Sequence, residues 1–257
     1  NVQSTIKATQ FLKRITKTTT TAAQLAVARS NFKKDIRMFK EIFKNPNFQP
    51  DLLKIYPLAL IKEAPLYKLY KKNKFKPYPE KKLIKLLVEI KKEIPFWCRI
   101  QRIIRDIPSK NIIAGGVKIS NLREVVQKKM KEKGLKCKCI RCREIREDYK
   151  PNEKLYLFRE DYWASNGKEI FLSFENKERE KLYALLRLRF SSNYILPVLE
   201  KSIIIRETHT YGQMIPVNEK SLSAQHKGLG KKLIKKAEKI AKEEFKINKV
   251  AVISGIG

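Results

Sequence analysis

Three of the four cysteines lie within six residues, in the string Cys137-Lys138-Cys139-Ile140-Arg141-Cys142. Three thiolates at this spacing can hold one metal ion from a tight turn. A structural zinc site needs a fourth ligand. The remaining cysteine, Cys98, would complete a four-cysteine site, and neighbouring basic residues would favour the thiolate form. The other interpretation is three buried or redox-active thiols.

A second group of residues suited to chemistry is the turn Gln225-His226-Lys227-Gly228-Leu229-Gly230, which opens an amphipathic stretch that ends near residue 245. A glycine-rich turn at a helix N-terminus presents backbone N–H groups to an anion, and the helix dipole adds attraction. The turn lacks the Gly-Lys-Ser/Thr ending of a Walker P-loop. The pattern therefore predicts a phosphate site of another kind.

The formal net charge is +32, from 58 Lys+Arg against 26 Asp+Glu. This excess argues against a protein whose main partners are small apolar ligands, and it favours nucleic acid. The alternative is the lysine bias of thermophilic proteomes, although that bias adds charges of both signs.

The hydrophobic content of 42% argues against wholesale disorder. Since no apolar stretch approaches the ~20 residues that span a bilayer, we expect a cytoplasmic protein without a membrane partner.

The elements of the first half must position Cys98. Apolar periodicity predicts alternating helices and strands after residue 32, which favours a parallel α/β arrangement. We also expect a helical face over residues 6–15, and a Ser120 cap and a Gly134 end for the last helix. The predicted helices are 32–43, 65–72, 79–94 and 121–133, and the predicted strands are 52–60 and 96–104.

The second half must position the glycine-rich turn. Asn166-Gly167 predicts a hairpin whose two turn residues both have φ > 0. The predicted strands are 154–164, 168–175, 183–190, 202–211 and 250–254, and the predicted helix is 228–245. Together they form a mostly antiparallel sheet with one late helix. We place the domain boundary in residues 144–153.

The order of the elements in the second half resembles the acyl-CoA pyrophosphate site of the GNAT acetyltransferases. In this order, antiparallel strands are followed by Gln-x-x-Gly-x-Gly, a helix and a strand. Further strings resemble the catalytic subunit of Elongator, over roughly residues 32–257. These strings are Asp51–Pro57, Tyr78, Arg102–Pro108, Ser120–Arg123, Cys137–Glu144, Arg206–Gly212, Pro216–Val217, Gln225–Gly230 and Val250–Gly257. Single-chain relatives of this kind occur in archaea, which suits the lysine-rich composition.

The resemblance implies an α/β fold class with three parts. Residues 1–133 would form the C-terminal part of a radical-SAM (β/α) barrel, with residues 1–31 unassigned. Residues 134–153 would form a zinc-bound linker, and residues 154–257 a GNAT-like α+β acetyltransferase domain truncated at its C-terminus. The implied activity is modification of the wobble uridine of tRNA at C5, which uses acetyl-CoA and S-adenosylmethionine radical chemistry and leads to carboxymethyluridine-type products.

The resemblance also implies site residues. The strand carrying Glu207, Thr208, His209 and Thr210 would pair with the pantetheine of acetyl-CoA, and Gln225, His226, Lys227, Gly228, Leu229, Gly230 and Lys231 would hold its pyrophosphate. Zinc would bind Cys98, Cys137, Cys139 and Cys142. The candidates for phosphate contacts with tRNA are Arg99, Arg102, Arg105, Lys136, Lys138, Arg141 and Arg143; for each of them a solvated basic face is the competing interpretation.

The chain also departs from the family. The Cys-x₃-Cys-x₂-Cys loop that binds the 4Fe-4S cluster is missing, residues 15–31 do not resemble the family, and the chain stops before a tyrosine pair. We therefore expect a truncated form.

His209, His226 and Glu207 are weak candidates for a catalytic base. The alternatives are a tRNA-binding module without catalysis and a protein lysine acetyltransferase, although no acidic pocket for lysine is evident. A homodimer and Elongator-type partner subunits are the expected assemblies.

Overall fold

The computed structural model describes residues 22–27, 31–104, 107–115, 121–146, 152–191, 196–212 and 228–253. The chain forms two compact units. The first contains residues 22–44 and 51–139, and the second contains residues 45–50 and the chain from residue 140 onward. The division therefore falls inside the segment that we assigned to a linker. No described helix has the length and apolar character needed to cross a membrane, and the cytoplasmic location stays a prediction.

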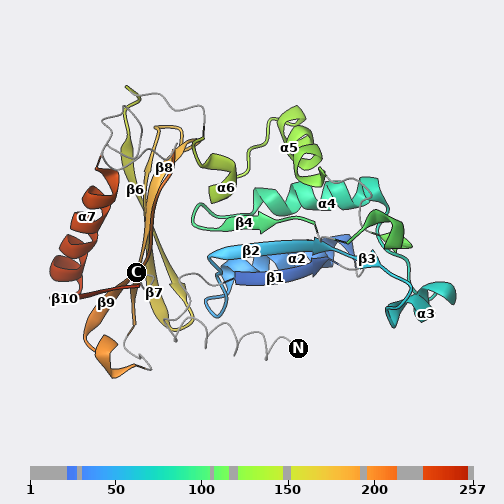
Figure 1. Cartoon of the computed structure of the whole chain (residues 1–257), viewed down its shortest axis with the longest axis horizontal. Coiled ribbons are helices and arrows are strands. Elements are labelled where there is room, and N and C mark those ends of the chain that lie inside the picture. Colours follow the sequence, from blue (N-terminus) through green and yellow to red (C-terminus); the bar gives the residue numbers. More distant parts are fainter. Residues whose placement is uncertain are drawn as a thin grey trace. The chain divides into compact units, whose positions relative to one another are not determined.

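The first unit is built on three parallel strands in the order β1-β2-β4, which confirms the predicted parallel arrangement (Figure 1). In helix α4 the buried apolar residues include Leu83, Leu86, Leu87 and Ile90. The strands are β1 (Ala22–Val27), β2 (Leu52–Pro57) and β4 (Arg99–Arg102), and the helices are α2 (Phe32–Lys44), α4 (Glu80–Lys92) and α5 (Leu122–Glu132).

The structure corrects the strand predicted over residues 52–60. Residues Ala59–Leu60 form a separate strand, β3, which pairs antiparallel with β5 (Ala114–Gly115). The backbones approach closely there, because a Cβ on Gly115 would lie 2.6 Å from the carbonyl oxygen of Leu58. The available signal was Pro57, the last residue of β2, because a proline has no amide hydrogen to donate to a strand ladder.

The structure differs from the predicted elements in three further places. Strand β4 is shorter than residues 96–104, since the amide of Cys98 turns back to the carbonyl of Pro95. Strand β1 lies in a segment for which we predicted no element, whereas the helical face over residues 6–15 lies outside the described residues. Asn121, not Ser120, is the N-cap of α5.

Three predicted helix boundaries agree with the structure. Gly134 ends α5 with a φ of 65°, and the amide of the next residue, Leu135, donates to the carbonyl of Met130. Such a left-handed residue is a common helix stop. The short helix α3 (Leu66–Lys71) and helix α4 each follow directly after a proline, Pro65 and Pro79.

The second unit is a five-stranded sheet in the order β10-β9-β8-β7-β6, antiparallel except for the parallel pair β10 and β9. Helix α7 covers one face, and its apolar side packs on the core of the sheet (Figure 1). This agrees with the predicted antiparallel sheet with one late helix. The elements are α6 (Ile140–Arg143), β6 (Tyr156–Ala164), β7 (Gly167–Glu175), β8 (Leu182–Phe190), β9 (Ser202–Thr210), α7 (Leu229–Glu244) and β10 (Lys249–Val252), with a 3-10 turn at Pro197–Leu199. A further 3-10 turn, Ser109–Asn111, belongs to the first unit.

The hairpin between β6 and β7 forms as predicted, but its turn is shifted by one residue. Ser165 and Asn166 have φ values of 50° and 60°, while Gly167 pairs with Ala164 in the ladder. Glycine is needed at position 167 for another reason: a Cβ there would lie 2.6 Å from the Cζ atom of Arg189.

Candidate functional site

The sulfur atoms of Cys137, Cys139 and Cys142 lie within 4.8 Å of one another. A tetrahedral zinc ion with Zn–S bonds of about 2.3 Å needs sulfurs about 3.8 Å apart. The three side chains therefore fit three corners of such a site with small adjustments. Cys139 is buried, and the other two are half-buried. The group does not include Cys98, which is fully buried just before β4.

The basic residues predicted to meet tRNA differ in their surroundings. Lys136, Lys138 and Arg102 are exposed, and the Nζ atom of Lys138 lies 5.4 Å above the ring of Phe96. Arg99 and Arg141 are half-buried. Arg105 lies outside the described residues.

Arg143 does not occupy the surface position that we predicted. Its side chain is 4% exposed, and its Nη1 atom lies 2.7 Å from a carboxylate oxygen of Glu175. A buried guanidinium that already faces a carboxylate is unavailable to a phosphate in this conformation.

The second candidate site lies where β9 ends and α7 begins. Strand β10 pairs only with Ser202–Ile205 of β9, so Glu207–Thr210 have β8 on one side and no partner strand on the other among the described residues. A register shift separates the two halves of β9, since Arg187 and Leu188 of β8 face Glu207 and Ile205. Within the described part of the chain, the second half of β9 therefore offers an open backbone edge.

The N-terminus of α7 adjoins this edge. A Cβ on Gly230 would lie 3.7 Å from the Oγ1 atom of Thr210, which places the first turn of the helix beside the last residue of β9. Gly228 is the N-cap, with a φ of 63° and open space at its Cβ position. No acidic residue lies in the first turn. The amides of this turn and the helix dipole are therefore available to an anion.

The other residues predicted for this site are placed as follows. Thr208 and His209 are exposed and Lys231 is exposed, while the side chain of Leu229 is buried in the core. Leu229 can therefore offer only its backbone to a ligand. Gln225, His226 and Lys227 lie outside the described residues.

The side chains of two candidate bases already have neighbours. The Nε atom of Arg187, which is 1% exposed, donates to Glu207 over 2.7 Å. The ring of His209 contacts that of Tyr211, with 4.4 Å between centroids. Both side chains thus already contact a neighbour beside the second half of β9.

A network of buried charges supports β9 and was missed by sequence reasoning. Glu169 on β7 is 1% exposed and accepts hydrogen bonds from Arg189 over 2.6 Å and from Arg206 over 2.9 Å. Arg189 also donates to the carbonyls of Ala164 and Ser165. Charged residues at alternate positions of otherwise apolar strands were the available signal.

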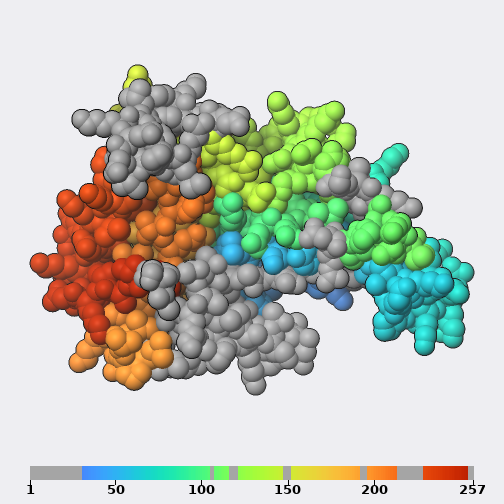
Figure 2. Space-filling model, viewed as in Figure 1, coloured from blue at the N-terminus to red at the C-terminus, as the bar shows by residue number. Residues whose placement is uncertain are grey.

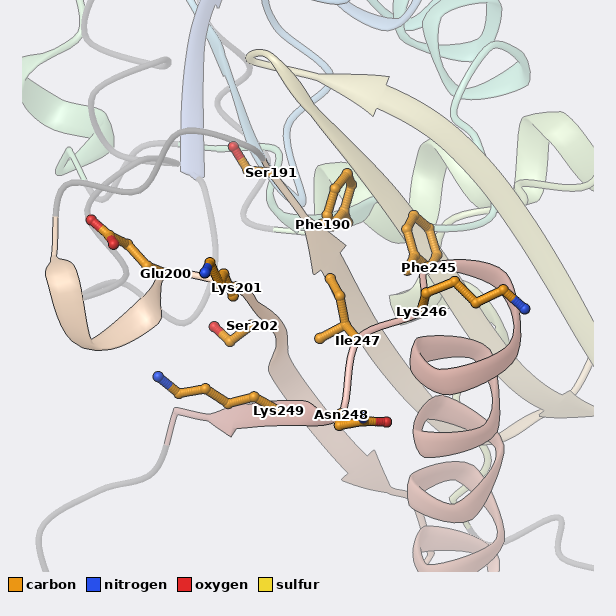
Figure 3. A pocket seen from close by; sticks show the side chains of 10 residues that line it. All are labelled: Phe190, Ser191, Glu200, Lys201, Ser202, Phe245, Lys246, Ile247, Asn248 and Lys249. Carbon is orange, nitrogen blue, oxygen red and sulfur yellow. The ribbon is translucent and has the colours of Figure 1, made fainter.

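A cavity of about 1060 Å³ lies at the opposite end of β9, away from the predicted ligand residues. Figure 3 shows Phe190 and Phe245 side by side at one wall, with Ile247 pointing toward them. The ring centroids of Phe190 and Phe245 are 4.8 Å apart. The starts of β9 and β10, with Ser202 and Lys249, form another wall. None of the residues that we predicted for acetyl-CoA, zinc or tRNA lines this cavity.

Comparison with known proteins first defines a class. The family model of the radical SAM C-terminal domain matches residues 50–132, which include β2, β4, α4 and all of α5. The first unit is thus largely a radical SAM C-terminal domain.

Longer matches are more specific. The chain is 44% identical, over its whole length, to tRNA uridine(34) acetyltransferase of Methanocaldococcus infernus, and it covers 50% of that protein. It is 39% identical to human Elongator complex protein 3, with 87% of this chain and 42% of that protein aligned. The structure of archaeal Methanocaldococcus infernus Elp3 with an N-terminal deletion superposes with a TM-score of 0.87, at 42% identity over 98% of this chain and 61% of that chain.

The chain is therefore similar to the Elongator catalytic subunit family over its whole length, and the predicted resemblance is confirmed. It spans about half the length of the curated relatives that it matches. The match to the archaeal relative covers the whole of this chain, whereas the human match covers 87% of it; the prediction that residues 15–31 differ from the family stays a prediction.

Proposed function

We propose that this chain is part of an enzyme that modifies the wobble uridine of tRNA at C5 with acetyl-CoA as the acyl donor. The observation that carries the proposal is the meeting of two features in the second unit. The open edge of Glu207–Thr210 and the N-terminal turn of α7 lie side by side, because Gly230 adjoins Thr210. An acyl-CoA has amides that suit a strand edge and a pyrophosphate that suits a helix N-terminus.

In this proposal the second unit is a GNAT-like acetyltransferase domain, and each residue has a defined task. The backbone of Glu207–Thr210 pairs with the pantetheine amides. The amides of Leu229, Gly230 and Lys231 bind the pyrophosphate, and Gly228 leaves room for it. Arg187 holds the Glu207 carboxylate at the rim, so that Glu207 and His209 orient the acyl end of the ligand.

The radical chemistry of the family needs S-adenosylmethionine and a 4Fe-4S cluster, which together supply a carbon-centred radical when bound. The four cysteines of this sequence are Cys98 and the group at positions 137, 139 and 142, and their spacing does not match the Cys-x₃-Cys-x₂-Cys loop. The residues present therefore do not fit the cluster, and we assign no step to it here.

Zinc is the metal that we propose for the cysteine group. Cys137, Cys139 and Cys142 would supply three thiolates, and Cys98 is the candidate for the fourth. Closed four-cysteine sites stabilise local folds and do not take part in catalysis. Elemental analysis should find stoichiometric zinc in the parent protein and less in Cys139→Ser. Cys98→Ser tests the fourth ligand, and a parent protein without zinc would exclude the site.

The acyl-CoA site is tested by Gly230→Asp in the full-length protein. A carboxylate there would face the pyrophosphate, so tRNA-dependent acetyl-CoA turnover should fall by more than about tenfold. Lys235→Asp, which places a carboxylate on an exposed position of the same helix, is the matched control. Turnover that depends on neither tRNA nor Gly230 would overturn the proposed activity. Retained tRNA binding without any turnover would favour the binding module.

A further inference from the structure

The segment of residues 61–77 lies between β3 and α4 and has no buried residue. It contains the short helix α3, which also buries none of its side chains. Figure 1 shows α3 standing away from β2 and α4 within the first unit, and Figure 2 shows its side chains, in cyan, at the surface. The segment therefore contributes little to a core, and its composition needs another explanation.

The backbone of this segment is ordered by its own hydrogen bonds. The amides of Ala64 and Tyr67 donate to the carbonyls of Ile61 and Ala64, which leads the chain into α3. At the other end, Asn73 has a φ of 52°, and the amide of Lys74 donates to the carbonyl of Leu69 over 2.9 Å. This arrangement is a typical helix stop. The side chains of α3 are therefore presented on a defined scaffold.

Two of these side chains form an aromatic pair. The rings of Tyr67 and Tyr70 lie 6.4 Å apart between centroids, with an angle of 21° between their planes. The Nζ atom of Lys71 lies 5.2 Å from the centroid of Tyr67. Nearly parallel rings with a cation beside them are the elements that bind unpaired bases, which stack on the rings while their phosphates meet the cation.

The charge of the segment selects the kind of partner. It contains six lysines and one glutamate, Glu63, for a net charge of +5. The lysines, all exposed, are Lys62, Lys68, Lys71, Lys72, Lys74 and Lys76. An apolar protein partner would have to desolvate these cations, whereas a polyanion gains from them. Aromatic faces among lysines thus favour a single-stranded nucleic acid.

We propose that residues 61–77 bind unpaired nucleotides of the tRNA substrate, with Tyr67 and Tyr70 as stacking surfaces and the surrounding lysines as phosphate contacts. The proposal rests on the proposed function, since that function supplies tRNA as the partner. To that function it adds the place where the tRNA binds and the way in which its bases are held. Because stacking needs open base faces, an RNA duplex without unpaired nucleotides should gain only the electrostatic part.

The test measures RNA binding to the full-length protein by fluorescence anisotropy. The ligands are tRNA, a single-stranded RNA and a blunt RNA duplex. The double variant Tyr67→Ala/Tyr70→Ala should weaken tRNA and single-strand binding roughly tenfold or more. The matched variant Tyr67→Phe/Tyr70→Phe keeps both rings and should bind like the parent, and duplex binding should be unchanged in both.

The lysines are tested separately by salt dependence. Lys68→Gln/Lys71→Gln/Lys72→Gln should reduce the slope of log K against log salt by about 2, because each phosphate contact with a single strand contributes about 0.7. Lys235→Gln/Lys239→Gln/Lys242→Gln on α7 is the control with the same change of charge. Equal slopes in the two triple variants would exclude a special role for the segment.

The outcomes separate the two proposals. If the parent binds tRNA and the tyrosine-to-alanine variant binds it within twofold of the parent, this inference is wrong and the proposed function stands. If the loss is equal for the duplex, stacking on unpaired nucleotides is wrong. If the parent does not bind tRNA at all, the proposed function itself fails.

Discussion

The cationic side chains of the second unit's sheet and those of the segment 61–77 lie in opposite environments. In the sheet unit Arg143, Arg187, Arg189 and Arg206 are at most 4% exposed, and each lies beside a carboxylate. The segment contains six lysines, no arginine and no buried residue. A planar guanidinium satisfies several acceptors at once, whereas the strongly hydrated ammonium stays in water. The net charge of +32 therefore describes two populations, and only the exposed one can serve a polyanion.

The largest effect that tests this comparison is expected at Glu169. Glu169→Ala leaves Arg189 and Arg206 buried without their shared carboxylate, so the free energy of unfolding should fall by about 3–5 kcal/mol. Urea denaturation of the purified protein measures this change. The control is Glu243→Ala, which removes an exposed partner of Lys239 at 3.6 Å and should cost less than about 1 kcal/mol. Similar losses in both variants would contradict the distinction between buried and exposed pairs.

A smaller effect is expected at Gly167, where the backbone makes room for Arg189. Gly167→Ala places a Cβ 2.6 Å from the Cζ atom of that arginine and should lower the free energy of unfolding by about 1–3 kcal/mol. Gly134→Ala is the matched control, because no atom lies within 4 Å of its Cβ position and only its φ of 65° matters. Its cost should be about 1 kcal/mol. If Gly167→Ala is neutral in thermal unfolding, the arginine is not packed as described.

The exposed pair of Arg159 and Glu244 should contribute less and should depend on pH. Hydrogen bonds from Arg159 hold the pKa of Glu244 below its ordinary value of 4.5. The stabilisation is therefore present above pH 4.5 and is lost as the pH falls through the lowered pKa. Arg159→Ala should cost less than about 1 kcal/mol at neutral pH, since the pair is solvent-screened, and should raise the pKa of Glu244 in a carboxyl NMR titration. An unchanged titration would contradict the pairing.

The smallest effect on folding is expected in the segment 61–77. Lys68→Gln/Lys71→Gln/Lys72→Gln removes three exposed cations that pack against no core, so the free energy of unfolding should stay within about 0.5 kcal/mol of the parent. Thermal unfolding at low and high salt measures this. A clear loss of stability would mean that these lysines have a structural role, and the contrast with the buried arginines would weaken.

Periodicity was sufficient for the elements that bury one continuous face. Helices α2 and α4 and strands β8 and β9 begin and end within about two residues of their predicted bounds, because their apolar spacing is regular. The split between β2 and β3 was missed, although Pro57 at the end of β2 was a local signal against one continuous strand. The break depends on β5, which is far away in the sequence.

The candidate site was predictable only in its separate parts. The cysteine spacing and the two glycines of the turn are local features of the sequence, and the structure keeps both groups compact. The position of Gly230 beside Thr210 depends on how α7 packs on the sheet. The burial of Arg143 depends on Glu175 in another strand, which no local pattern reveals.

The contact between residues 45–50 and the hairpin of the second unit has a consequence for how this chain can be divided. The amide of Ser165 donates to the carbonyl of Pro46 over 2.6 Å, and its hydroxyl donates to Asn47. A fragment that begins at residue 140 would lack both acceptors, although it contains every strand of the sheet. During synthesis, residues 45–50 leave the ribosome about a hundred residues before their hairpin does. At a synthesis rate of about 5–20 residues per second, the hairpin that residues 45–50 contact emerges on the order of ten seconds after them.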